Sequence, residues 1–156
     1  MSKENADKEQ KRSFKREVFS WIACIVVTIL LTEFILNFVI INANIPSGSM
    51  ENTIMTNDKL IALRTSYWFN DPKRGDIIIF KYPDDETEWF IKRVIALPGE
   101  TVLVKDGKVY INGSKKALSE PYIKEEPVED FGPYKVPKNG YFVMGDNRNN
   151  SNDARE

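Results

Sequence analysis

The sequence predicts an all-β domain that follows one N-terminal transmembrane helix, and two observations predict it. First, an apolar run extends for 24 residues from Val18 to Ile41 and is interrupted only by Glu33 and Asn37, which are four residues apart and would share a helix face. A run of this length exceeds the roughly 20 residues that a helix needs to cross a bilayer. Second, the chain after Ile41 is a series of short apolar segments bounded by turn residues, with no helical period of useful length.

The charges on either side of the apolar run predict its orientation. Residues 1–17 hold six basic side chains, whereas residues 42–50 hold none. Basic flanks stay in the cytoplasm, so we expect a cytoplasmic tail at 1–17, a transmembrane helix at 18–41 and an extracytoplasmic β-rich domain at 42–156. The alternative is a cleaved signal peptide with Ala43 near its cleavage site. The apolar core of such a peptide is usually about 7–15 residues, so the length of this run favours a permanent anchor.

The outer domain shows five strand-like segments. They cover residues 59–64, 75–82, 89–97, 101–113 and 140–146. The fourth contains Asp106-Gly107 between alternating apolar residues, which is a strong signal for a β-hairpin. Residues 51–57 have room for a short turn. The charged, proline-bearing segment 114–138 is predicted to be an exposed excursion rather than part of the core.

Composition excludes several classes of protein. Lys and Arg together number 22 against 23 for Asp and Glu, so no attraction to nucleic acid is expected. The single cysteine, Cys24, rules out an intrachain disulfide. The chain has no histidine, which removes Ser-His-Asp and Cys-His mechanisms and leaves only carboxylates for a metal site. We therefore predict no metal and no cofactor, and any nucleophile here needs a base other than histidine.

One segment contains an unusual pair of charges. In "WFIKRVIAL", residues 89–97, both strand faces are apolar except at the adjacent Lys92 and Arg93. Buried charges need partners, but a lysine can instead lose its proton, because burial lowers the pKa of its ammonium group. The alternative is an edge strand on which both charges face water.

Several motifs in order carry a resemblance to a known family. They are "IPSGSMENT" (45–53), "KRGDIIIFKYP" (73–83), "FIKRVIALPGE" (90–100) and "VMGDNRNNSNDAR" (143–155). Behind an N-terminal anchor, they make the chain resemble the type I signal peptidases, Ser-Lys proteases of the short Gram-positive type. The resemblance implies an all-β catalytic domain of coiled antiparallel sheets on the outer face of a bacterial plasma membrane. It also implies signal-peptide-bearing preproteins as substrates, and the lipid bilayer and secretion machinery as further partners.

The resemblance also implies a role for individual residues. Ser49 matches the nucleophile and Lys92 the general base, while Ser47 would line the oxyanion hole together with the Ser49 N–H. Ser151 would hydrogen-bond and position the lysine. Three further residues, Asp146, Asp153 and Arg155, would be structural neighbours of the site, and three apolar residues, Ile45, Met50 and Ile91, would shape the substrate pocket. An extended substrate segment would pair with a strand edge and place alternate side chains in pockets.

The chain departs from the family pattern in two places. Asn52 stands where the nucleophile motif commonly has proline, and the sequence ends at Glu156, where relatives continue with more β-structure. We therefore expect either a C-terminally truncated domain or a domain that closes in an unusual way. The rival function is that of a truncated or inactive relative that binds exported chains without cutting them. Another Ser-Lys peptidase, of the self-cleaving repressor type, is disfavoured by the membrane anchor.

Overall fold

The computed structural model describes residues 3–83 and 85–155, which divide into two compact units. The smaller unit comprises residues 1–41 with 63–65, and the larger comprises residues 42–62 and 66–156. Met1 and Ser2 of the predicted tail lie outside the described residues, as do the side chains of Lys3, Lys8 and Lys11.

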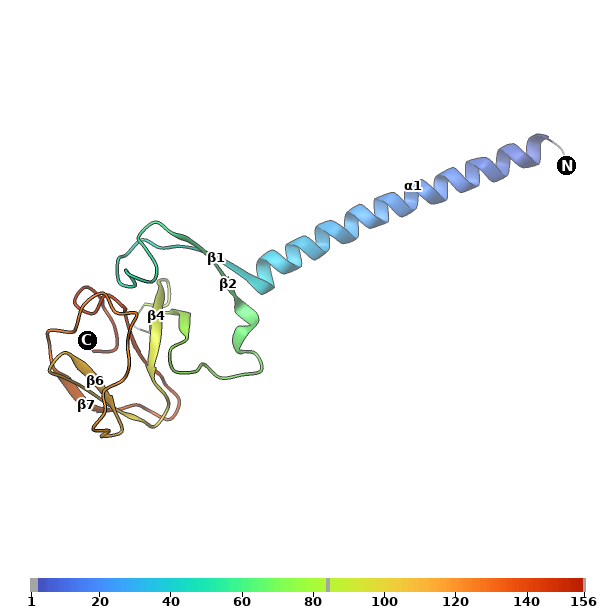
Figure 1. The fold of residues 1–156 in the computed structure, drawn as a ribbon. Helices are drawn as coiled ribbons and strands as arrows, with labels where there is room; N and C mark the ends of the chain where they lie inside the picture. Colours follow the sequence, from blue (N-terminus) through green and yellow to red (C-terminus); the bar gives the residue numbers. More distant parts are fainter. Residues whose placement is uncertain (1–2, 84, 156) are drawn as a thin grey trace. The chain divides into compact units, whose positions relative to one another are not determined.

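The smaller unit is dominated by a single helix. The helix α1 (Lys3–Phe34) continues into a π-helical segment, Ile35–Val39 (Figure 1). Residues Phe14–Val39 are long and apolar enough to cross a membrane, judged by length and composition. The helix begins inside the predicted tail, and the last helical residue is Val39, two residues before Ile41, the predicted end of the span. The β-branched Ile40 and Ile41 instead open strand β1 (Ile40–Asn44).

Glu33 and Asn37 share a helix face, as predicted. The side-chain amide of Asn37 donates to the Glu33 carboxylate at 3.0 Å and to the Glu33 carbonyl at 2.8 Å. The bond to the carbonyl satisfies a backbone group in the last turn of α1, just before the π-helical segment.

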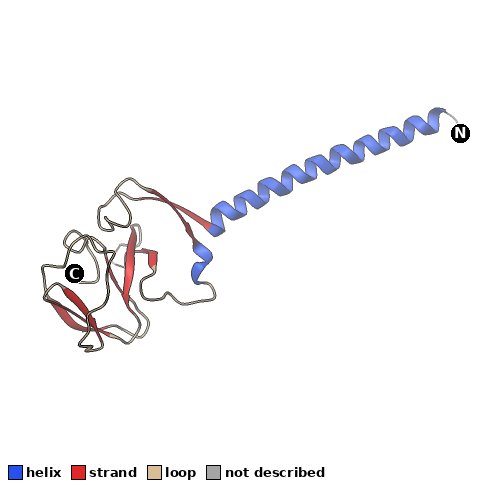
Figure 2. Cartoon of the chain, in the orientation of Figure 1, coloured by secondary structure: helices blue, strands red, loops and turns tan. Residues whose placement is uncertain are grey.

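The rest of the chain forms three small antiparallel assemblies (Figure 2). The strand β1 pairs with β2 (Lys59–Leu63), which leads into a short 3₁₀ helix, Arg64–Tyr67. The second sheet has the order β3-β4-β8 and the third the order β6-β5-β7. The bounds of these six strands are β3 (Ile77–Lys81), β4 (Trp89–Ala96), β5 (Thr101–Lys105), β6 (Lys108–Ile111), β7 (Phe131–Lys135) and β8 (Phe142–Met144). The prediction of β-structure behind one N-terminal apolar helix is confirmed.

Two buried apolar clusters organise the larger unit. The larger cluster comprises Ile95, Ala96, Val102, Val104, Val109, Val136, Phe142 and Met144, drawn from both three-stranded sheets. The second cluster comprises Ile45, Met50 and Ile54, on which Leu60, Ile77 and Ile91 pack. The second cluster includes Met50, the neighbour of Ser49, and therefore packs against the segment that contains Ser49.

The predicted hairpin is present at Asp106-Gly107. The φ angles of the two residues are 49° and 74°, as a two-residue turn with positive φ at both positions requires. The turn joins β5 to β6, whose residues Val104 and Val109 face each other in register.

The prediction for segment 114–138 was partly wrong. Residues 131–135 form β7, which pairs with β5, and Val136 is buried in the larger cluster. Aromatic contacts hold this strand, with the Phe131 ring centroid 5.5 Å from that of Phe142. Gly132 and Pro133 interrupt the alternation of side chains that would have marked a strand, so local pattern did not reveal it.

The position of β4 decides between the two interpretations of Lys92 and Arg93. The strand lies between β3 and β8, with Ile78 opposite Lys92 and Met144 opposite Arg93. It is therefore a central strand, and the edge-strand alternative is wrong. Lys92 and Arg93 are 4% and 9% exposed, so both charged side chains are buried.

Candidate active site

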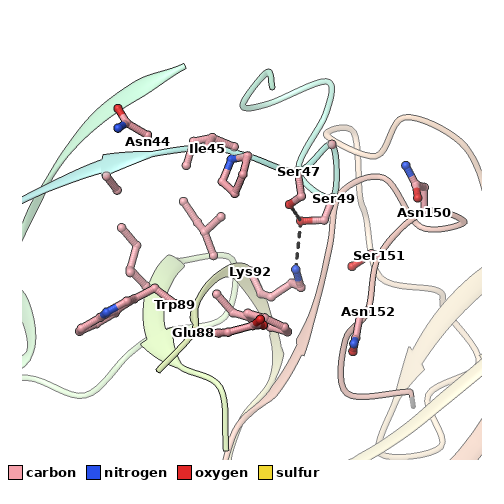
Figure 3. A pocket seen from close by; sticks show the side chains of 16 residues that line it. Asn44, Ile45, Ser47, Ser49, Glu88, Trp89, Lys92, Asn150, Ser151 and Asn152 are labelled. Carbon is pink, nitrogen blue, oxygen red and sulfur yellow. Dashed lines mark hydrogen bonds between the residues drawn. The ribbon is translucent and has the colours of Figure 1, made fainter. Parts of the chain in front are cut away.

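Ser49 and Lys92 meet although 43 residues separate them in the sequence. Ser49 lies in a turn closed by the Glu51 N–H, which donates to the Gly48 carbonyl at 3.1 Å, and Lys92 projects from the middle of β4. The Lys92 Nζ lies 3.0 Å from the Ser49 Oγ, within hydrogen-bonding distance. Figure 3 shows the two side chains pointing toward one another, joined by a dashed line. Ser49 is 5% exposed, so this contact is shielded from bulk water.

The surroundings of Lys92 favour its neutral form. Burial lowers the pKa of the Lys92 ammonium group below the ordinary lysine value, and the negative charge of Asp153 partly offsets this by raising it. Burial is the larger influence, so the net shift of the pKa is downward. A lysine in this position is able to accept a proton from a neighbouring hydroxyl group.

A cavity of about 530 Å³ opens beside the pair. Its walls come from four parts of the larger unit. They are residues 43–49, Ile79 of β3, residues 88–92 at the start of β4, and the loop residues 150–152. Ser49, Lys92 and Ile45 line it (Figure 3). Ile91 lines it as well. The cavity therefore places apolar side chains next to a hydroxyl and an amine.

Two further serines line the cavity. The Ser47 Oγ lies 3.4 Å from the Ser49 Oγ. Ser151 comes from the 150–152 loop, and its Oγ is buried without a hydrogen-bond partner in the described part of the chain. The expected hydrogen bond from Ser151 to Lys92 is therefore not formed in this structure. Gly145 leaves room for Ser151, because a Cβ at residue 145 would collide with the Ser151 Oγ and the Ser49 carbonyl oxygen.

Met50 occupies a different place from the one predicted. It is 0% exposed and belongs to the buried cluster with Ile45 and Ile54, so it supports the cavity wall instead of facing the cavity. The reason is the turn at 48–51, which points successive side chains in different directions. Ile45 contributes both to the cluster and to the wall, whereas the resemblance had grouped all three apolar residues as pocket residues.

Asp146 binds Arg93, the second charge of β4. The Arg93 Nε and Nη2 donate to the two carboxylate oxygens at 2.8 Å and 2.6 Å, and Thr53 donates to the same carboxylate. Asp146 is 0% exposed, and the Asp146 carboxylate is the largest influence raising the pKa of the Arg93 guanidinium group. The sequence required a partner for Arg93, but pattern alone did not identify which acid supplies it.

Asp153 and Arg155 form an ion pair two residues apart. The Arg155 Nε donates to Asp153 at 2.8 Å, and the Gly145 N–H donates to the other carboxylate oxygen at 3.0 Å. A second buried pair joins Arg148 to Glu120 at 2.6 Å. The Arg148–Glu120 pair attaches the 145–155 segment, which includes Ser151, to residue 120, whereas the Asp153–Arg155 pair lies within that segment. Glu120 lies in the segment predicted to be an exposed excursion, so sequence reasoning missed its role.

Asn147 binds the backbone carbonyls of the two peptide bonds that flank the Ser49 Cα. Its N–H donates to the Ser49 carbonyl and its side-chain amide to the Gly48 carbonyl, each at 3.0 Å. In the sequence, only the position of Asn147 in the "GDNRNNSND" motif indicated that this residue belongs to the site. In the described residues, no group of three or more acidic or cysteine side chains is placed to hold a metal ion.

The structure combines an N-terminal apolar helix, antiparallel β-sheets and a buried serine-lysine pair. Comparison with known proteins identifies the family to which the chain belongs. Residues 18–156 match the family model described as signal peptidase, peptidase S26. A signal peptidase I of Bacillus amyloliquefaciens is 38% identical over 94% of this chain and 82% of its own length. A probable signal peptidase I-2 of Synechocystis is 46% identical over 83% of this chain, which spans only 61% of that relative.

A crystal structure of a signal peptidase I from Enterococcus faecalis is also similar. It is 38% identical, covers 55% of this chain and 86% of its own, and superposes with a TM-score of 0.48. The chain belongs to the signal peptidase I family, the serine endopeptidases that cleave signal peptides from secreted preproteins.

Proposed function

We propose that this chain is itself a membrane-anchored signal peptidase and that Ser49 and Lys92 carry out the cleavage. The observation that carries the proposal is the 3.0 Å separation of the Ser49 Oγ and the Lys92 Nζ at the wall of the cavity. A serine hydroxyl is a weak nucleophile until a base removes its proton. Because the chain has no histidine, an amine with a lowered pKa is the base that the site offers.

The reaction follows from these groups. Neutral Lys92 takes the proton of the Ser49 hydroxyl as its oxygen attacks the scissile carbonyl carbon. The oxyanion that forms is stabilised by the Ser49 N–H and by the Ser47 hydroxyl, and each such donor contributes roughly 3–4 kcal/mol in other hydrolases. The Lys92 ammonium then protonates the leaving amine. Water hydrolyses the resulting ester, with Lys92 again acting as the base.

The substrate is held by the cavity. The segment of a signal peptide just before the cleaved bond is extended. It can pair with the backbone of residues 43–46 or 88–91, so that its alternate side chains enter the cavity. The apolar side chains of Ile45 and Ile91 narrow the space beside Ser49 and favour small substrate residues. The Arg93–Asp146 pair joins β4 to the 145–155 segment, and the Asp153–Arg155 pair lies within that segment.

The proposal extends to the membrane. The apolar helix anchors the chain in the bilayer, with residues 1–17 in the cytoplasm and residues 42–156 on the outer face of a bacterial plasma membrane. Ser49 follows the predicted end of the span, Ile41, by eight residues, so preproteins emerging from the secretion machinery would meet the site close to the membrane surface. No nucleic acid partner is proposed.

Cleavage of a preprotein by the full chain in detergent tests the proposal. The variants Ser49→Ala and Lys92→Ala should each lose activity by at least about a thousandfold, because neither half of the pair functions alone. Ser66→Ala and Lys81→Ala remove the same groups from exposed positions and should leave cleavage unchanged. If both site variants still process the preprotein, the Ser-Lys assignment is wrong. If the unmodified chain binds the preprotein and never cuts it, the rival binding function is correct.

A further inference from the structure

Part of the segment predicted to be an exposed excursion lies against the turn that holds Ser49. We call residues 48–53 the nucleophile turn and residues 120–125 the strap. The Asn52 side-chain amide donates to the Tyr122 carbonyl at 3.0 Å and lies 3.4 Å from the Ile123 carbonyl. The Lys124 Nζ donates to the Glu51 carboxylate at 2.6 Å. Two successive residues of the nucleophile turn are therefore bound by the strap.

The backbone of Asn52 has an unusual conformation. Its φ is 87°, in the left-handed region, and the Thr53 N–H donates to the Met50 carbonyl at 3.0 Å. Asn52 is thus the third residue of a β-turn, where type II turns need a positive φ and accept Gly or Asn. Proline, which the family motif commonly has at this place, is fixed near −65° and cannot adopt this turn. Asn52 both permits the turn and attaches it to the strap.

The strap is itself attached to the rest of the site. The Lys124 N–H donates to the Asp146 carbonyl at 3.0 Å, and the Arg93 guanidinium lies 3.9 Å from the centre of the Tyr122 ring. Glu125, the last residue of the strap, forms a parallel β-bridge with Asn147, the residue that binds the Gly48 and Ser49 carbonyls. The strap therefore contacts the nucleophile turn directly through residues 51 and 52, and indirectly through Asn147.

We propose that the strap is a positioning element that holds the Ser49 Oγ against the Lys92 Nζ, with Asn52 and Lys124 as its two points of attachment. This inference rests on the proposed function of Ser49 as nucleophile. A serine side chain is short, so the position of its Oγ follows the backbone of its turn closely. A displacement of about 1 Å in a reacting group lowers the rate by as much as a hundredfold. The strap contacts neither residues 43–46 nor residues 88–91 in the hydrogen bonds described above, so substrate binding should be little affected.

Variants at residue 52 separate the conformation from the hydrogen bond. Asn52→Gly keeps the positive φ and removes the bond to the strap, and Asn52→Ala removes the bond and also disfavours the conformation. We expect kcat to fall in this order, by about tenfold for Asn52→Ala, with KM changed less than twofold. Lys124→Ala should lower kcat in the same way. The rising limb of the pH profile should stay where it is, because the surroundings of Lys92 do not change.

Asn112→Ala is the matched control. Asn112 also has a positive φ, 53°, and its side chain also binds a backbone group, the Thr101 N–H at 2.8 Å. It lies in the turn after β6, outside the residues that line the cavity. Asn112→Ala should reduce thermal stability to a similar extent as Asn52→Ala and leave kcat unchanged. The comparison therefore removes any effect that comes from lower stability alone.

Amide hydrogen exchange provides a measurement that does not depend on cleavage. The Thr53 and Ile54 amides both donate to the Met50 carbonyl and report on the nucleophile turn. Their exchange should be faster in Asn52→Ala and Lys124→Ala than in Asn112→Ala. Equal exchange and equal kcat in all three variants would overturn the role of the strap. Continued cleavage by Ser49→Ala would instead overturn the proposed function, and the exchange result would still decide whether the strap holds the turn.

Discussion

At the scale of single residues, the site depends on how the charge of Lys92 is controlled. Burial and Asp153 act on the pKa of its ammonium group in opposite directions. Burial favours the neutral amine that a base must be, whereas Asp153 favours the ammonium form, which must donate a proton to the leaving group. An amine with a pKa nearer the working pH can serve both steps.

The first prediction concerns Asp153→Asn. Activity should rise with pH as Lys92 loses its proton, and the midpoint of this rise follows the Lys92 pKa. Removing the negative charge of Asp153 takes away the influence that raises that pKa, so the rising limb of kcat/KM should move to lower pH. A pH profile of preprotein cleavage measures this.

Asp130→Asn is the control for this prediction. Asp130, like Asp153, accepts a hydrogen bond from a backbone N–H, that of Asp106 at 3.0 Å. Asp130 is not among the groups that shift the pKa of Lys92. Its pH profile should match that of the unmodified chain. A shift of the rising limb to higher pH in Asp153→Asn would contradict the assignment of Lys92 as the base.

The second prediction concerns the buried pair of Arg93 and Asp146. Asp146→Ala leaves the Arg93 guanidinium buried without its counter-ion, which should lower the free energy of unfolding by about 3–5 kcal/mol. Denaturant unfolding of the chain in detergent measures the change. Glu86→Ala breaks the exposed pair with Lys81, whose atoms are 3.9 Å apart, and should cost less than about 1 kcal/mol. Equal costs for the two variants would show that Asp146 does not act as a buried counter-ion.

At the scale of secondary-structure elements, the segment 114–138 belongs to the fold in a way that its composition conceals. Its end supplies β7 and the buried Val136, while its middle supplies the strap. Specific polar or aromatic contacts hold both parts in place, so both can contain charged residues and prolines. Neither part shows the alternating apolar pattern that would mark a strand. Composition therefore indicated a loop where the structure has an edge strand and a positioning element.

The third prediction tests this role with two substitutions of the same type in the same segment. Val136→Ala removes a buried side chain and should lower the free energy of unfolding by about 2 kcal/mol. Val128 is 82% exposed, so Val128→Ala should change the free energy of unfolding by less than about 0.5 kcal/mol. Denaturant unfolding distinguishes the two. If Val136→Ala costs no more than Val128→Ala, the end of the segment does not contribute to the core.

At the scale of the whole molecule, the proposed function requires the helix to cross the bilayer in one direction. The prediction uses cysteine labelling in a Cys24→Ser background, with Ser13→Cys before the apolar run and Ser66→Cys after it. A membrane-impermeant maleimide should label position 66 in intact cells and position 13 only after permeabilisation. The reverse pattern would place the β-rich domain in the cytoplasm and exclude preproteins in transit as its substrates.

The sequence alone determined the features that depend on neighbouring residues or on a characteristic motif. The apolar run is recognisable because hydropathy is a local property, and the hairpin because Asp106-Gly107 suits its positive φ angles. The pattern of one strand singled out Lys92 and Arg93, but it left an exposed edge strand open, and the central position of β4 decided that both side chains are buried. Only the tertiary structure decided which groups meet, since Arg93 and Asp146 are 53 residues apart and Asn52 and Tyr122 are 70 apart. Met50, Ser151 and the strap could not be placed from the sequence, because a side chain's direction in a turn is set by long-range packing that no local pattern encodes.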